Sequence, residues 1–76
     1  MLDLDSILKN LVEVIKSIKN ITSEEIEELN KKKEYISNID DRESKKDLIR
    51  YLAEEYEAKY GLQIGYIIEL LNDDKP

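Results

Sequence analysis

The side chains that could carry out chemistry are few, because the chain contains neither histidine nor cysteine. A nucleophilic triad usually takes histidine as its base, so only a serine–lysine pair is available for covalent catalysis. The candidate nucleophiles are Ser6, Ser17, Ser23, Ser37 and Ser44. They fall at expected helix ends or on polar faces, where hydroxyls are ordinary. The usual ligands of zinc, copper and haem are also missing, and we expect no metal and no cofactor.

Two groups of neighbouring carboxylates are candidates for acid–base chemistry or cation binding. Glu54, Glu55 and Glu57 form one group, and Asp40 with Asp41 forms the other. A catalytic carboxylate pair needs a concave pocket that shifts a pKa, and a helical domain of this size has little room for one. The second group lacks the alternating ligands and the glycine of a calcium loop, so helix capping explains it better. We therefore expect that the protein is not an enzyme.

The charged residues favour a protein partner over a nucleic acid. Eighteen acidic residues against twelve basic ones give a formal charge of -6, which is poorly suited to phosphate backbones. The only basic run is Lys31-Lys32-Lys33. Glu27 lies four residues before Lys31, and Glu28 lies four residues before the next lysine, which is the favourable order for ion pairs on a helix. The run is therefore expected on a solvated face, and no direct binding of nucleic acid is expected.

Tyrosine is the only aromatic residue type, and it occurs five times. Tyr56 and Tyr60 are four residues apart on one expected helix face, which predicts core positions with hydroxyls that reach solvent. Tyr51 falls off that face. Because tyrosine is enriched at protein interfaces, Tyr51 is a candidate contact residue.

Hydrophobic periodicity predicts the first two helices. Over residues of about 3–20 the apolar side chains occupy an arc about 180° wide, with polar side chains opposite. Thr22 and Glu25 form a capping box that starts a second helix, expected over residues of about 23–38. Its apolar stripe is narrow and consists of Ile26, Leu29 and Ile36. So thin a stripe predicts contact with only one neighbouring helix.

A third and a fourth helix follow. The third is expected over residues of about 42–60, with Gly61 as a left-handed C-cap. Its start is open, because either Asp40 or Ser44 could cap it. The fourth, expected over residues of about 63–72, is apolar nearly all round. A buried strand is the alternative for this segment, but a lone strand would leave its backbone hydrogen-bonding groups open.

These elements predict a single all-α domain over residues 1–76: a small bundle of three longer helices and a short C-terminal one, with residues 73–76 as a disordered tail. Met1-Leu2-Asp3 lacks the positive charges of a secretory signal. No apolar run approaches the roughly 18 residues of a membrane span. We therefore expect a cytoplasmic protein without a membrane partner.

The apolar surface of the first and fourth helices exceeds what the other two are expected to cover. This surplus predicts a small acidic protein-binding module, such as a regulator, inhibitor or immunity-type factor. It would associate with a larger protein or with itself as a homodimer, and the acidic balance favours a basic patch on the partner. The expected contact residues are Ile7, Leu11, Val14, Ile18, Tyr51, Tyr66, Ile67 and Leu70.

Two other functions are alternatives. An acidic mimic of nucleic acid would inhibit a DNA- or RNA-binding protein, and it would need its glutamates on one continuous face. Those glutamates are Glu24, Glu25, Glu27, Glu28, Glu54, Glu55 and Glu57. An all-helical enzyme is less favoured, because sites for small anions usually recruit several arginines and only Arg42 and Arg50 exist. No small-molecule substrate is expected.

Overall fold

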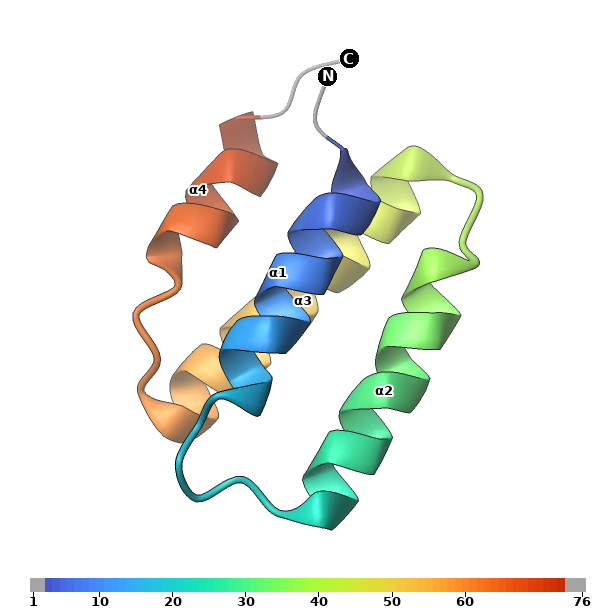
Figure 1. Cartoon of the computed structure of the whole chain (residues 1–76). Helices are drawn as coiled ribbons and strands as arrows, with labels where there is room; N and C mark the ends of the chain where they lie inside the picture. Colours follow the sequence, from blue (N-terminus) through green and yellow to red (C-terminus); the bar gives the residue numbers. More distant parts are fainter. Residues whose placement is uncertain (1–2, 74–76) are drawn as a thin grey trace.

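The structure is a computed structural model that describes residues 3–73 of the chain. It contains four helices, α1 (Leu4–Lys16), α2 (Ser23–Ser37), α3 (Arg42–Tyr60) and α4 (Gly65–Asp73) (Figure 1). No strand occurs among the described residues, so the prediction of an all-α bundle with three longer helices and a short fourth is confirmed. Residues 74–76 of the predicted disordered tail lie outside the described part, whereas position 73 is the last residue of α4.

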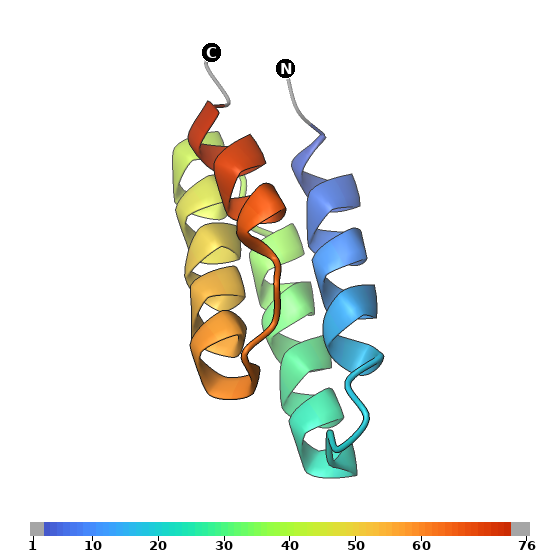
Figure 2. The same ribbon diagram turned by 90° about the vertical axis from the view of Figure 1, so that its left-hand side faces the viewer.

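α1 and α3 form the centre of the bundle, and the other two helices flank them. α2 packs against both α1 and α3, whereas α4 lies along α3 on the opposite flank (Figures 1 and 2). The prediction that α2 contacts a single neighbour is therefore wrong. Its apolar residues Leu29 and Ile36 are buried, because a narrow stripe can enter the groove between two helices.

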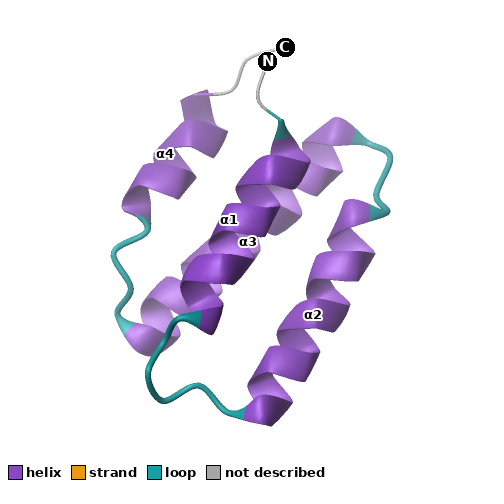
Figure 3. Ribbon diagram, in the orientation of Figure 1, coloured by secondary structure: helices purple, strands orange, loops and turns teal. Residues whose placement is uncertain are grey.

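α1 is capped at its start and ends earlier than its apolar pattern predicts. The Asp3 carboxylate accepts hydrogen bonds from the backbone N–H groups of Asp5 (3.1 Å) and Ser6 (3.3 Å). The helix ends at Lys16 rather than near residue 20, and a loop leads to α2 (Figure 3). Ile18 and Ile21 lie in this loop but still pack against the core. The apolar pattern thus predicted correctly that these residues pack against the core, but it did not show that the helix ends before them.

The ends of the later helices are set by local backbone chemistry. Asp41, rather than Asp40 or Ser44, caps α3, and its carboxylate accepts from the Ser44 backbone N–H at 3.0 Å. Gly61 ends α3 in the left-handed conformation with φ of 66°, as predicted, and its N–H donates to the carbonyl of Glu57 at 2.8 Å. α4 begins at Gly65, about two residues later than expected.

The core is continuous through all four helices, and α1 contributes most of it. The buried residues of α1 are Leu4, Ile7, Leu8, Leu11, Val12 and Ile15. Ile67 and Leu71 of α4, together with Ile64 just before the helix, belong to the same core. The large apolar arc of α1 is therefore covered within the chain.

Candidate protein interface

Two exposed tyrosines face one another across the seam between α2 and α3. Tyr35 of α2 is 65% exposed and Tyr51 of α3 is 71% exposed. Exposure on this scale is unusual for so large an apolar ring, because burying one stabilises a folded chain. The other large apolar side chains that the structure exposes are Tyr66 (57%) and Leu70 (45%), both on α4.

The surface between the two tyrosines is hollowed into a groove of about 310 Å³. We call it the tyrosine groove, and it is lined by Lys32, Tyr35, Ile36, Leu48, Tyr51, Leu52 and Glu55. Ile36 and Leu52 belong to the buried core, and Leu48 is partly buried against it. The groove therefore has an apolar floor, in which Ile36 and Leu52 are almost fully buried and Leu48 keeps part of its surface open to solvent.

Helical spacing explains why these residues meet. On α3 the groove residues are at positions 48, 51, 52 and 55, which is the three- and four-residue spacing of one helix face. On α2 the groove residues are at positions 32, 35 and 36, with the same spacing. Two helix faces packed side by side thus supply the floor from their inner edges and the tyrosines from their outer edges.

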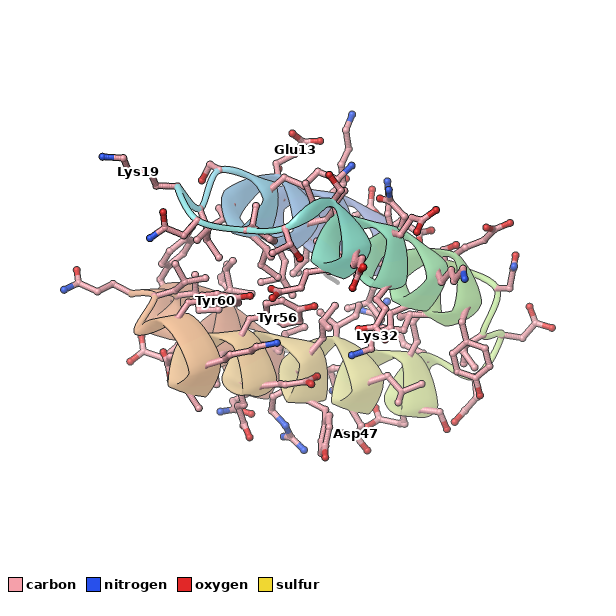
Figure 4. The ribbon with its side chains drawn as sticks, turned by 90° about the horizontal axis from the view of Figure 1, so that it is seen from below. Glu13, Lys19, Lys32, Asp47, Tyr56 and Tyr60 are labelled. Atoms are coloured by element: carbon pink, nitrogen blue, oxygen red, sulfur yellow. The ribbon has the colours of Figure 1, made fainter. Side chains whose placement is uncertain are left out.

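A charged pair closes one end of the groove. Lys32 Nζ lies 3.4 Å from Glu55 Oε1, so the lysine bridges α2 and α3. The same ammonium group lies 5.9 Å from the centre of the Tyr56 ring, within range of a cation–π contact. Figure 4 shows Lys32 extending from α2 toward α3 beside Tyr56. This lysine is therefore part of the seam between the helices and is less available to a partner than its place in a basic run suggests.

Beyond the charged pair, stacked tyrosines fill the seam. The rings of Tyr56 and Tyr60 are 5.9 Å apart between centroids and inclined by 24°. Tyr56 is buried, and this burial raises the pKa of its hydroxyl above the ordinary value of 10.0. The hydroxyl of Tyr60 is also buried and finds no hydrogen-bond partner among the described residues, so the expectation that both hydroxyls reach solvent is wrong for Tyr60.

Lys59 makes the same two kinds of contact at Tyr60 that Lys32 makes at Tyr56: one with an aromatic ring and one with a glutamate. Lys59 Nζ lies 5.5 Å from the centre of the Tyr60 ring and 3.9 Å from Glu25 Oε2. Glu25 was expected to cap α2 reciprocally with Thr22. Thr22 Oγ1 does accept from the Glu25 backbone N–H at 3.1 Å, while Oε2 of the glutamate points toward α3. Between Lys32 and Lys59, the seam is thus covered by lysine side chains that lie over the Tyr56 and Tyr60 rings. The tyrosine groove lies beyond Lys32, between Tyr35 and Tyr51.

The outer face of α3 is acidic around Tyr51. We call Asp47, Glu54 and Glu55 the acidic strip, and all three side chains are exposed. The positions of this face, 44, 47, 51, 54, 55 and 58, include no lysine or arginine. Two shallower hollows border the strip, and both include Tyr51 and Glu54.

The three carboxylates of the strip differ in their partners. Asp47 Oδ1 lies 3.2 Å from the Arg50 guanidinium, and Glu55 is held by Lys32. Glu54 forms no ion pair with any of the residues that the structure describes. The negative charge beside Tyr51 is therefore only partly neutralised by the chain itself.

The structure divides the eight contact residues predicted from sequence into three sets. Ile7, Leu11 and Ile67 are buried in the chain's own core, where a partner cannot reach them. Val14 and Ile18 are half-buried against that core. Tyr51, Tyr66 and Leu70 are exposed, but Tyr51 lies at the groove whereas the other two lie on α4.

Of the seven residues that line the groove, only Tyr51 was predicted from sequence as a contact residue. Tyr35 and Leu48 were not among the predicted contact residues, although both line it. Tyr35 directly follows a polar stretch and sits off the narrow apolar stripe of α2, so periodicity assigned it no role. A useful signal was available: Tyr35 adjoins Ile36, and Tyr51 adjoins Leu52, so each exposed tyrosine is next to a core residue.

Comparison with known protein families, with characterised proteins and with solved structures finds no match to this chain. Among residues 3–73, no group of three or more acidic side chains is placed to hold a metal ion. No helix in that range is long and apolar enough to cross a membrane.

Proposed function

We propose that the chain is a small protein-binding module, and that it holds a segment of another protein in the tyrosine groove. The observation that carries this proposal is the pair of largely exposed tyrosines on either side of an apolar floor. Tyrosine is among the residues most enriched at protein interfaces and at their energetic hot spots. Regulation or inhibition of the bound protein is the activity that fits so small a binding domain.

The size of the groove is consistent with a useful affinity. A tyrosine side chain buries about 150 Å² or more on full burial, and about two thirds of each groove tyrosine is still exposed. At about 25 cal/mol per Å², covering both rings would contribute about 5 kcal/mol. A free energy of 5 kcal/mol corresponds to a Kd of about 0.2 mM, and part of it is offset by the cost of association, so micromolar binding requires a comparable contribution from the apolar area that the bound segment itself buries.

Self-association has less support in the structure than it had in the sequence. The apolar surplus that suggested a homodimer included Leu11 and Ile67, which are 0% and 2% exposed within one chain. Among residues 3–73, the large apolar side chains exposed away from the groove are Tyr66 and Leu70 on α4. They are four residues apart on one helix face, which is a small patch compared with the area of a stable dimer.

Mimicry of nucleic acid also has less support. Two of the seven glutamates proposed as phosphate substitutes pair with lysines of the chain: Glu25 with Lys59, and Glu55 with Lys32. In addition, Glu55 and Glu57 are two positions apart on α3, so they project about 200° apart around the helix. These features do not favour one continuous anionic face.

Selection from a displayed peptide library tests the proposal directly. The wild-type chain is the target, and a Tyr35→Ser/Tyr51→Ser variant is used for counter-selection. Tyr66→Ser is the matched control, because Tyr66 is also an exposed tyrosine but lies on α4. Enriched peptides should bind the wild type and the control equally and bind the double variant at least tenfold more weakly. Enriched peptides that bind all three proteins equally would show that the groove is not the binding site.

A further inference from the structure

We infer that the occupant of the tyrosine groove is a cationic amphipathic helix of a partner protein, which places apolar side chains on the floor and lysines or arginines against the acidic strip. This inference rests on the proposed function and adds the chemistry of the partner. The rim of the groove carries charged side chains. On the α3 side, Asp47, Glu54 and Glu55 lie around Tyr51, with Arg50 at the edge beside Asp47 and Glu54.

Some charged groups at the groove form ion pairs within the chain, and others do not. Lys32, the only basic residue that lines the groove, is already paired with Glu55. Glu54 has no ion-pair partner in the described part of the chain. On the α3 side of the groove, the charge that the chain leaves unpaired is therefore negative, and an incoming segment gains most if the residues that flank it there are positive.

The shape of the tyrosine groove favours a helical occupant. The tyrosine groove runs between two helices and has a volume of about 310 Å³, roughly the space of two large aliphatic side chains. A helix that lies in such a groove anchors itself through residues three, four or seven apart, because these share one face. Basic residues on the flanks of that face would then lie over the acidic strip. A groove that takes two anchors calls for a partner helix of only a few turns.

The same charges separate this occupant from a second copy of the same chain. A two-fold dimer through the groove would bring two acidic strips close together, and each copy carries a net charge of -6. In a head-to-tail arrangement, exposed lysines of one copy, Lys31 among them, would meet the acidic strip of the next, but the two copies would still repel one another through their net charges of -6. The charge distribution therefore favours a partner of opposite sign over self-association.

Two synthetic helical peptides of about 18 residues, or five turns, provide the test. Both carry leucine at the same positions of one face, and the remaining positions are lysine in one peptide and glutamate in the other. Binding to the full chain is measured by fluorescence anisotropy at about 0.15 M salt, where charges interact over about 8 Å. The lysine peptide should bind at least tenfold more tightly than the glutamate peptide. Tyr51→Ser should weaken its binding at least tenfold.

A charge-matched pair of variants locates the effect. Glu54→Gln and Glu13→Gln each remove one negative charge from an exposed carboxylate, but Glu13 lies on α1 and points away from the α2–α3 seam (Figure 4). Glu54→Gln should weaken the lysine peptide about two- to fivefold, and Glu13→Gln should leave its binding unchanged. The difference should disappear at about 1 M salt, because charges are then screened within about 3 Å.

The possible failures are distinguishable. Equal binding of both peptides, lost in Tyr51→Ser, would overturn the inference about charge and leave the groove as a protein-binding site. Equal effects of the two glutamate variants would show a response to net charge alone, which also overturns it. Absence of binding by the lysine peptide rejects this occupant, while the library selection still decides the proposed function. A dimer in sedimentation equilibrium that Tyr51→Ser dissociates would make a second copy the occupant.

Discussion

Replacing Leu11 with alanine should destabilise the folded chain strongly, because this side chain lies at the centre of the core. Leu11 is 0% exposed and belongs to a core cluster whose members come from all four helices. Removing a fully buried leucine side chain to the β-carbon costs about 3–5 kcal/mol, from lost apolar burial and from the cavity that remains. A domain of this length has a free energy of unfolding of about 4–11 kcal/mol in total. The substitution should therefore remove at least about a quarter of the stability.

Val14→Ala is the matched control on the same helix. Val14 is only half-buried, so the two carbons lost from it would contribute about 0.8 kcal/mol, half of their fully buried value. Alanine is also a better helix former than valine by about 0.5 kcal/mol, which offsets much of that loss. The two variants should differ by at least 2 kcal/mol.

Urea denaturation followed by far-ultraviolet circular dichroism measures this difference. With a slope of about 1 kcal/mol per M for a small domain, Leu11→Ala should lower the midpoint by about 3 M or leave the chain unfolded in buffer. The measurement is made at two protein concentrations, because a dimer would give concentration-dependent midpoints. A Leu11→Ala midpoint equal to that of the wild type would refute the core assignment and would restore Leu11 as an interface residue.

Three further predictions concern a helix end and two titrating groups. Because Gly61 has a φ of 66°, Gly61→Ala should lower the free energy of unfolding by about 1 kcal/mol. Gly65 has an ordinary φ and open space around it, so Gly65→Ala should raise the free energy of unfolding by up to about 1 kcal/mol. Denaturation in urea measures both changes, and shifts of the same sign would contradict this account. Hydrogen bonds from Ser44 lower the pKa of Asp41 below 3.8, so the stability that its carboxylate contributes is present above that pH and is lost as the pH falls through the folded-state pKa. Asparagine can still cap a helix, so the free energy of unfolding of Asp41→Asn should fall less between neutral and acid pH than that of the wild type. An unchanged acid profile would count against the cap. Burial raises the pKa of Tyr56 above 10.0, so its contribution is present below that pH and is lost above it. Tyr56→Phe should remove one tyrosinate transition above pH 10.0 from the ultraviolet absorbance titration, and a variant that keeps every such transition of the wild type would contradict this assignment.

Much of the fold follows from local sequence patterns. The N-cap of α2 at Thr22 and the C-cap of α3 at Gly61 are where the sequence predicts them, because each depends on a few adjacent residues. The start of α3 was ambiguous for the same reason, since both Asp40 and Ser44 could accept the capping hydrogen bonds, and the residue that caps the helix is neither of them. Asp41 is the one whose carboxylate reaches both the N–H and the hydroxyl of Ser44.

The candidate site was harder to predict, because it depends on which helix faces meet. Periodicity identifies an apolar face but does not say whether that face is covered within the chain. Leu11 and Ile67 were expected to meet a partner, yet the chain covers both with its own helices. Conversely, Tyr35 belongs to no apolar stripe, and it becomes notable only because α2 packs beside α3 and places it opposite Tyr51.

The open groove follows from the unequal apolar content of the helices. α2 has a narrow apolar stripe, so it fills the space between α1 and α3 with few core residues, and its flank against α3 has to be closed by other means. Toward one end, long amphipathic side chains close it: Lys32 lies over Tyr56, and Lys59 lies over Tyr60. Toward the other end, Lys45 of α3 donates to the Ser37 carbonyl of α2 at 3.3 Å, and between this contact and Lys32 the groove is open between the two tyrosines. The weakness of one helix as a core element thus creates the surface best suited to a partner.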